Sequence, residues 1–219
     1  MNNRVFITGC GSGLGASLYK KASETTAVFP HYREATPTVW RLIGDLRDPD
    51  FPDKVDEFIR RCDINVFINN AGVHLSKSPR KTTDEEVDEV IESNLTSQIK
   101  VLNRVYNYFV EKNDGMIINI NSLCVRHPSP TETVYCASKF GLLGFSKALQ
   151  IDALGRNVEI VDVFPGAVQT RMTRNRDNYE TLMSADEVAE EVISLLDKRG
   201  KTFYNSEVVL RKRNESSGS

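Results

Sequence analysis

The stretch RVFITGCGSGLG, residues 4–15, joins a short apolar run to a glycine-rich turn. The apolar run predicts a β-strand, and residues 11–24 predict a helix that starts inside the turn. A turn of this kind, between a strand and a helix, lets the backbone approach a pyrophosphate, which the free N–H groups of the first helical turn then face. A strict GxGxxG pattern fails because Leu14 stands where the third glycine would be. The pattern that fits is TGxxxGxG, formed by Thr8, Gly9, Gly13 and Gly15.

Short apolar runs alternate with amphipathic stretches along the rest of the chain. Predicted strands occupy residues 4–9, 26–32, 39–45, 64–70, 115–121, 158–166 and 202–212. Predicted helices occupy residues 11–24, 52–62, 83–112, 132–154 and 184–200. Such alternation is typical of βαβ units. We therefore predict a single doubly wound α/β domain over residues 1–212, of Rossmann type, with a parallel seven-stranded sheet, helices on both faces and a disordered tail over 213–219.

The composition excludes several classes of partner. The net charge is −2 and 26% of the 219 residues are charged, so there is no global basic field for nucleic acid. We find neither a secretory signal nor an apolar segment of membrane-spanning length, and we expect a cytoplasmic protein that binds no membrane. The four cysteines form no CxxC pair and the three histidines are scattered, so we predict reduced thiols and no metal site.

Further motifs follow the glycine-rich turn in order and at fitting distances. NNAG at residues 69–72 ends the fourth predicted strand, Asn94 lies in the long predicted helix, and Ser122 follows the fifth strand. YCASK, residues 135–139, comes thirteen residues after that serine, and Pro165 begins a PG pair at the end of the sixth strand. Over nearly its whole length the chain thus resembles the short-chain dehydrogenase/reductase family. Any one motif can occur by chance, whereas five in series are a strong signal.

The resemblance implies a catalytic set of Asn94, Ser122, Tyr135 and Lys139. Tyr135 would be the general acid that protonates a carbonyl oxygen, or the base that accepts a proton from an alcohol. Ser122 would hold the substrate oxygen, and Lys139 would bind the nicotinamide ribose. Asn94 would interrupt its helix and keep a water in a proton relay.

Tyr135 and Lys139 are four residues apart, so a helix places them on the same face. A positive charge about 6 Å from a phenol, at an effective dielectric of about 20, is worth about 3 kcal/mol or about two pKa units. We therefore expect Lys139 to lower the pKa of Tyr135 toward neutrality. Alone, a tyrosine and a lysine at this spacing more often decorate a solvated helix face.

The resemblance also implies a set of cofactor-binding residues. They are Gly9, Ser12, Gly13, Leu14, Gly15, Arg33, Asp45, Leu46, Asn70, Ala71, Gly72, Tyr135, Lys139, Pro165, Gly166, Val168 and Thr170. The choice between NAD and NADP is expected at the end of the second strand. Arg33 lies eighteen residues after Gly15 and can bind a 2′-phosphate bidentately, so we predict NADP(H), although the adjacent Glu34 argues for NAD.

The sequence thus predicts an oxidoreductase that transfers a hydride between NADP(H), or NAD(H), and a small carbonyl compound or secondary alcohol. The alternative is a non-catalytic dinucleotide sensor, although the complete acid/base set argues against it. A group of cations near the pocket suggests an anionic substrate, and the residues concerned are Arg126, His127, Arg171, Arg174 and Arg176. We also expect a homodimer or homotetramer that pairs through apolar positions of the helix bearing Tyr135, namely Leu142, Leu143, Phe145 and Leu149.

Overall fold

The computed structural model of the protein describes residues 2–34 and 40–213. Seven strands form one sheet in the order β3-β2-β1-β4-β5-β6-β7, and every neighbouring pair is parallel. The strands are Arg4–Ile7 (β1), Ala27–Tyr32 (β2), Leu42–Ile43 (β3), Val66–Asn69 (β4), Gly115–Ile120 (β5), Val158–Pro165 (β6) and Glu207–Leu210 (β7). The order reverses between β1 and β4, which makes the sheet doubly wound. The predicted fold class is confirmed.

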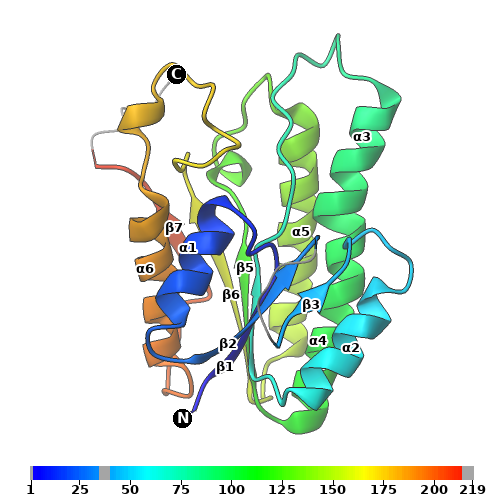
Figure 1. The fold of residues 1–219 in the computed structure, drawn as a ribbon, viewed down its shortest axis with the longest axis vertical. Coiled ribbons are helices and arrows are strands. Elements are labelled where there is room, and N and C mark those ends of the chain that lie inside the picture. The colour runs from blue at the N-terminus through cyan, green and yellow to red at the C-terminus, as the bar shows by residue number, and fades with distance from the viewer. Residues whose placement is uncertain (1, 35–39, 214–219) are drawn as a thin grey trace.

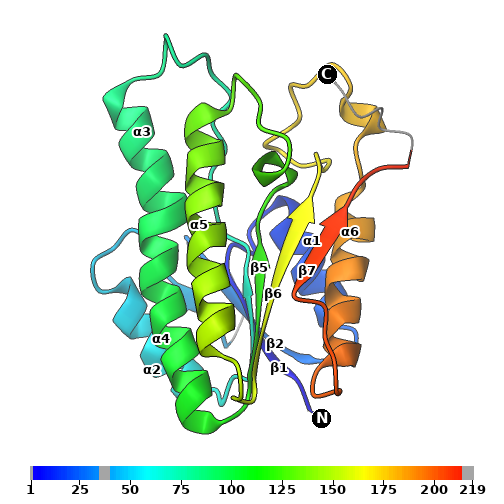
Figure 2. The same ribbon diagram turned by 180° about the vertical axis from the view of Figure 1, so that it is seen from behind.

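Helices cover both faces of the sheet (Figures 1 and 2). They are Gly13–Ala22 (α1), Phe51–Arg61 (α2), Asp84–Ile91 (α3), Ser97–Lys112 (α4), Thr133–Asp152 (α5) and Ala185–Ser194 (α6). Side chains of α1 and α6 form one core cluster with Val5 and Ile7, and those of α2, α4 and α5 form the other with Phe6. Successive strand side chains point to opposite faces, so a four-residue strand such as β1 supplies both cores.

Four predicted elements differ clearly from the structure. The helix expected over residues 83–112 is divided by a π-helical turn at residues 92–96. The third strand was expected over residues 39–45 but contains only Leu42–Ile43, because the backbone turns at Trp40, which has a φ of 55°. The seventh strand is likewise shorter than residues 202–212. The last predicted helix leaves the α conformation at Ser194 and continues as a 3₁₀ turn, Leu195–Lys198 (η4). Residues 214–219 of the predicted tail lie outside the described residues, as does the connection 35–39.

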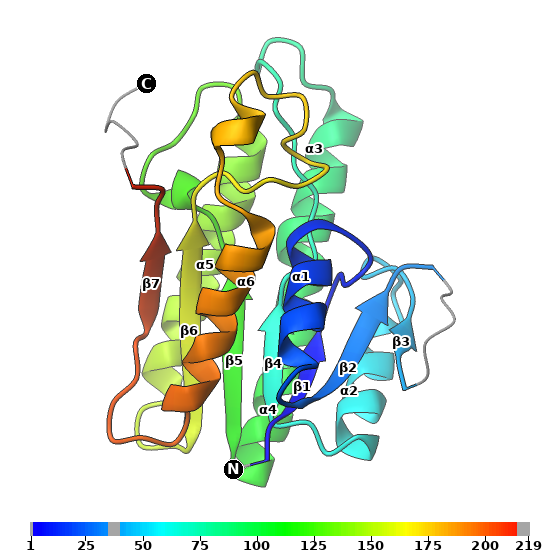
Figure 3. The same cartoon turned by 60° about the vertical axis from the view of Figure 1, so that its left-hand side comes forward.

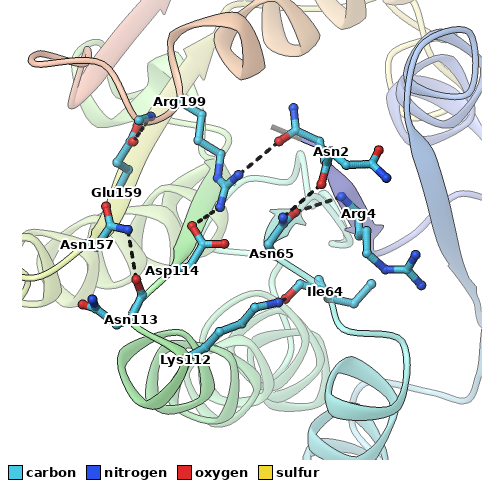
Figure 4. Close-up of polar contacts among 12 residues, drawn as sticks. Asn2, Arg4, Ile64, Asn65, Lys112, Asn113, Asp114, Asn157, Glu159 and Arg199 are labelled. Carbon is cyan, nitrogen blue, oxygen red and sulfur yellow. Dashed lines mark hydrogen bonds and ion pairs between the residues drawn. The ribbon is translucent and has the colours of Figure 1, made fainter.

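Polar contacts close the end of the sheet at which β1, β4 and β5 begin (Figure 4). Arg199, which is only 8% exposed, pairs with Asp114. Asn65 accepts the backbone N–H of Arg4 at 2.8 Å and donates to the carbonyl oxygen of Asn2 at 3.2 Å. At this end of the sheet the polar side chains bond to one another and to the backbone. The predicted motifs lie at the opposite end, where the parallel strands finish (Figure 3).

Further features of the described residues concern membranes, metal ions and disulfides. In residues 2–34 and 40–213, no helix is both long enough and apolar enough to cross a membrane. Within the same ranges, no three His, Cys, Asp or Glu side chains gather in a way that could hold a metal ion. The four cysteines are free and buried.

Candidate active site

The glycine-rich turn follows β1 and opens α1, as the sequence predicts. Gly9 and Gly13 have φ angles of 75° and 55°, which disfavour residues with a Cβ. A Cβ on Gly15 would lie 2.0 Å from the carbonyl oxygen of Gly9. Ser12 precedes α1 with an extended backbone and an exposed side chain that makes no cap, so it is available to another partner. The turn is thus a backbone cradle that side chains would fill.

The NNAG segment fixes this cradle to β4. Thr8 Oγ1 accepts the backbone N–H groups of Asn70 and Ala71 at 3.0 and 3.1 Å. The Asn70 side-chain amide donates to the carbonyl oxygen of Thr8 at 2.9 Å. Gly72 follows, and a Cβ there would lie 3.0 Å from Asn94 Oδ1. The segment therefore connects the glycine-rich turn to the helix that carries Asn94.

The predicted residues after β6 lie beside the same cradle. Pro165 ends the strand, and the Gly166 N–H donates to the Leu210 carbonyl oxygen at 2.9 Å. Val168 is buried in the core cluster that also takes up Leu14. A Cβ on Gly13 would lie 3.2 Å from the side chain of Thr170, so the first and the sixth strands bring these two residues together.

The predicted specificity residues lie at the other edge, after β2 and β3. The Arg33 side chain is 67% exposed, and its nearest carboxylate, that of Glu34, is 3.9 Å away. Asp45 accepts two hydrogen bonds from the Arg47 guanidinium at 3.0 and 2.8 Å, which lower the pKa of its carboxyl to about 2. Leu46 packs against the core. Arg33 is therefore available to a ligand, whereas Asp45 is held by its neighbour.

Tyr135 and Lys139 share one face of α5, as their spacing predicts. The Lys139 ammonium lies 5.9 Å from the centre of the Tyr135 ring and donates to the carbonyl oxygen of Ile120 at 3.0 Å. Lys139 is only 4% exposed, and burial lowers its pKa from 10.5 to about 8. Ser122, which follows β5, hydrogen-bonds to the Tyr135 side chain. The three side chains thus meet beyond the end of β5.

The expectation that Lys139 lowers the pKa of Tyr135 is wrong for the protein without a cofactor. Burial raises the pKa of Tyr135, and the hydrogen bond from Ser122 opposes this only in part. A lysine that acts through an effective dielectric of about 20 would acidify the phenol, but a desolvated phenolate loses its hydration and gains little from a lysine that is itself desolvated. Tyr135 is therefore held in its neutral form.

Asn94 interrupts its helix, as the resemblance implies. A π-helical turn, Glu92–Thr96 (η1), separates α3 from α4 and is the kind of bulge often found at functional sites. Asn94 is fully buried in this turn. Its side chain accepts the Val73 N–H at 2.8 Å and donates to the Val73 carbonyl oxygen at 2.8 Å. It also donates to Ser138 Oγ at 3.3 Å, which joins it to α5 next to Lys139.

Comparison with known proteins agrees with this geometry. The family model "short chain dehydrogenase" matches residues 3–181, most of the chain. The chain belongs to the short-chain dehydrogenase/reductase family. Members of the family are NAD(P)-dependent oxidoreductases that act on CH–OH or C=O groups, and this protein is one of them.

Two relatives agree with the assignment, and one solved structure has the same fold. Nodulation protein G of Rhizobium meliloti is 32% identical over 197 residues, which cover 83% of this chain and 80% of the relative. The 3-oxoacyl-[acyl-carrier-protein] reductase FabG of Chlamydia trachomatis is 27% identical, with coverages of 82% and 80%. A short chain dehydrogenase from Burkholderia cenocepacia, solved in complex with NADP, superposes with a TM-score of 0.81 at 23% identity and covers 96% of this chain and 89% of its own.

The sequence motifs give no sign of one residue that supports the glycine cradle. His31 is one of three scattered histidines in the sequence, yet it is only 1% exposed. Its Nδ1 accepts the Gly9 N–H at 3.1 Å, so its Nε2 carries the proton and donates to the Gly44 carbonyl oxygen at 2.9 Å. Burial lowers the pKa of His31, which keeps it neutral in this role. The only available signal was its place at the end of the second predicted strand.

Proposed function

We propose that the protein reduces a small carbonyl compound with NADPH, or oxidises the corresponding secondary alcohol with NADP, and that Tyr135 is its general acid and base. The observation that carries the proposal is the meeting of Tyr135, Lys139 and Ser122 beyond β5, on the same edge of the sheet as the glycine cradle. That cradle fits the pyrophosphate of a dinucleotide, because its backbone positions leave no room for a Cβ.

The cofactor, when bound, supplies the hydride. In the reduction, the Tyr135 hydroxyl donates its proton to the substrate oxygen while the Ser122 hydroxyl holds that oxygen in place. Burial keeps the phenol protonated, which is the form that a reduction needs at its start. The Lys139 ammonium then stabilises the phenolate that remains, since it lies 5.9 Å from the ring.

A Tyr135→Phe variant tests this role. We expect kcat to fall at least about 100-fold in a screen of carbonyl compounds that follows NADPH absorbance, with the dissociation constant for NADPH changed less than about threefold. Tyr106→Phe is the matched control, because the Tyr106 hydroxyl bonds to Asp152, away from the site. Turnover that survives in Tyr135→Phe contradicts the proposal. The competing proposal, a non-catalytic sensor, requires NADPH binding without turnover in the unchanged protein.

NADP(H) is proposed as the preferred cofactor because Arg33 is exposed beyond β2 and only loosely paired. Two structural neighbours, the Burkholderia enzyme and ElxO, were solved with NADP. We expect Arg33→Ala to lower kcat/KM for NADPH about tenfold and to leave that for NADH unchanged. Equal loss with both cofactors, or a preference for NADH in the unchanged protein, contradicts this choice.

An anionic substrate is a second hypothesis, and fewer residues now support it. Three of the five cations near the pocket have partners in the structure. The pairs are Arg126–Glu207, His127–Arg211 and Arg176–Glu132. Arg171 and Arg174 are exposed and carry the hypothesis alone. Arg171→Ala should then lower kcat/KM for a carboxylated ketone and not for a neutral one.

We also propose a cytoplasmic homodimer or homotetramer. The predicted contact residue Leu142 is fully buried in the core of the subunit, so this part of the expectation is wrong. The other three predicted positions pack partly against the core clusters, and they are Leu143, Phe145 and Leu149. Exposed apolar side chains of α5 and its end support the association, namely Phe140, Ile151 and Leu154 at 46%, 70% and 76%. A monomer in light scattering at micromolar concentration contradicts it.

A further inference from the structure

Three side chains from distant parts of the chain meet beside Tyr135. His74 comes from the segment after β4, Glu132 directly precedes α5, and Arg176 comes from the segment 171–183 between β6 and α6, called here the lid. His74 Nε2 and Glu132 Oε1 are 3.1 Å apart. Arg176 Nη2 donates to the same carboxylate oxygen at 2.6 Å. One carboxylate oxygen thus connects the lid to a ring that touches the catalytic tyrosine.

The contact between His74 and Tyr135 constrains the tyrosine ring. The two ring centroids are 4.8 Å apart and the planes meet at 76°, an edge-to-face arrangement. Such pairs are stabilised by the contact between the positive ring edge and the negative ring face. The His74 side chain is only 15% exposed, so little solvent separates the rings. An imidazole that changed its orientation would change the surface against which the phenol packs.

Glu132 determines the orientation of that imidazole. Its side chain is 12% exposed, and its hydrogen bond to His74, helped by Arg176, lowers the pKa of its carboxyl. The carboxylate is therefore charged at neutral pH and attracts both partners. Glu132 is also three residues before Tyr135, at the start of the same helix, so its position is tied to that of the phenol.

Arg176 brings the lid into this chain of contacts. Its side chain is 39% exposed and lines a polar cleft between the lid and the segments before α5 and after β4. The cleft is lined by Ser76, Thr131, Glu132, Arg176, Asp177 and Asn178, among others. Arg176 is thus the residue through which the lid contacts Glu132.

We propose that His74 is a positioning residue for Tyr135, and that Glu132 and Arg176 couple its orientation to the lid. The inference rests on the proposed function of Tyr135 and adds to it a route by which lid closure brings the phenol into line. A misplaced catalytic group can cost up to about 100-fold in rate, so the coupling acts on kcat rather than on cofactor binding.

A double-mutant cycle tests the coupling. We expect Arg176→Met to lower kcat about tenfold and to leave the dissociation constant for NADPH unchanged. Arg156→Met is the matched control, because Arg156 is an arginine of similar exposure (45%) that pairs with Asp152 away from the site, and it should change kcat less than about twofold. In a His74→Ala background, Arg176→Met should cause no further loss. An equal loss in both backgrounds overturns the proposal.

Two additions keep the test decisive. His74→Phe retains an aromatic edge against Tyr135 but cannot bond to Glu132, so it replaces His74→Ala if that variant does not fold, and Arg176→Met should have no effect in it either. Ring-¹³C tyrosine NMR, with Tyr135 assigned from the signal lost in Tyr135→Phe, reads the coupling without turnover. The Tyr135 signal should move in Arg176→Met and not in Arg156→Met. If it moves in a protein that reduces no carbonyl compound, the coupling stands and the proposed function fails. If it does not move in an active enzyme, the coupling is wrong.

Discussion

Replacement of Lys139 by methionine should change how the stability of the protein depends on pH. Burial lowers the pKa of this lysine from 10.5 to about 8. The difference, 10.5 − 8 = 2.5 units, corresponds to about 3 kcal/mol at about 1.36 kcal/mol per unit. Because the unfolded chain binds the proton more tightly, the free energy of unfolding is lower by this amount at a pH where the lysine is charged in both states. Lys139→Met removes the ionisable group and with it the penalty.

The sign follows from the direction of the pKa shift. Above pH 10.5 the lysine is neutral in both the folded and the unfolded state, so its ionisation does not lower the free energy of unfolding. As the pH falls through 10.5 toward 8, the unfolded chain takes up a proton that the folded chain does not, and the free energy of unfolding decreases. Relative to Lys139→Met, the unchanged protein should therefore lose about 3 kcal/mol between pH 10.5 and pH 7.5.

Urea denaturation followed by circular dichroism at several pH values from 7 to 10.5 measures this difference. Loss of the hydrogen bond from Lys139 to the Ile120 carbonyl oxygen shifts the whole curve of Lys139→Met but does not remove its pH dependence. Lys100→Met controls for the loss of a lysine as such, since Lys100 is an exposed residue paired with Glu92. A stability difference that stays constant over this pH range would refute the reasoning, because Lys139 would then be hydrated.

Two further outcomes are expected. Gly15→Ala should lower the affinity for NADPH more than about tenfold in a fluorescence titration, because the added Cβ would lie 2.0 Å from a backbone oxygen. Gly144→Ala should not lower it, because a Cβ added there would meet no atom within 4 Å. Equal affinities in the two variants contradict the role of the glycine cradle. Asp162 is fully buried, and its pKa is raised from 3.8 to about 6. The stability that its protonated carboxyl contributes is therefore fully present below pH 3.8 and is lost as the pH rises through 6. In thermal denaturation, the free energy of unfolding of Asp162→Asn should rise by about 3 kcal/mol relative to that of the unchanged protein between pH 4 and pH 7. A difference between the two proteins that does not change with pH counts against burial of the charge.

The sequence predicts well those features that depend on local pattern. The glycines of the first turn, the spacing of Tyr135 and Lys139, and the alternation of strands and helices along the chain all follow from short-range periodicity and sterics. Even the break at Asn94, which the family resemblance implied, takes its expected place as a π-helical turn. Because parallel strands end at one edge of the sheet, motifs that follow successive strands come together without any further signal in the sequence.

Features that depend on contacts between distant segments could not be predicted in the same way. His31 and Gly9 are 22 residues apart, and His74 and Glu132 are 58 apart. Nothing in the residues around either histidine distinguishes a buried partner from a solvated side chain. Arg176 was assigned to a cationic pocket because the sequence shows its charge and not its bond to Glu132. The partners of a polar side chain decide its role, and they become visible only once the chain is folded.

The electrostatics of the site show the same limit and give it a functional meaning. From the sequence, Lys139 is a charge that acidifies Tyr135. In the fold Lys139 is buried and Tyr135 is half-buried, and loss of hydration favours the neutral form of each. A neutral phenol can donate a proton at once, so the protein without cofactor holds Tyr135 in the form with which the reduction of a carbonyl group begins. Oxidation of an alcohol needs the phenolate, which the Lys139 ammonium must stabilise against the same burial. If a positively charged nicotinamide shares that task, the pH at which alcohol oxidation begins should lie below the pH at which Tyr135 titrates in the protein without cofactor.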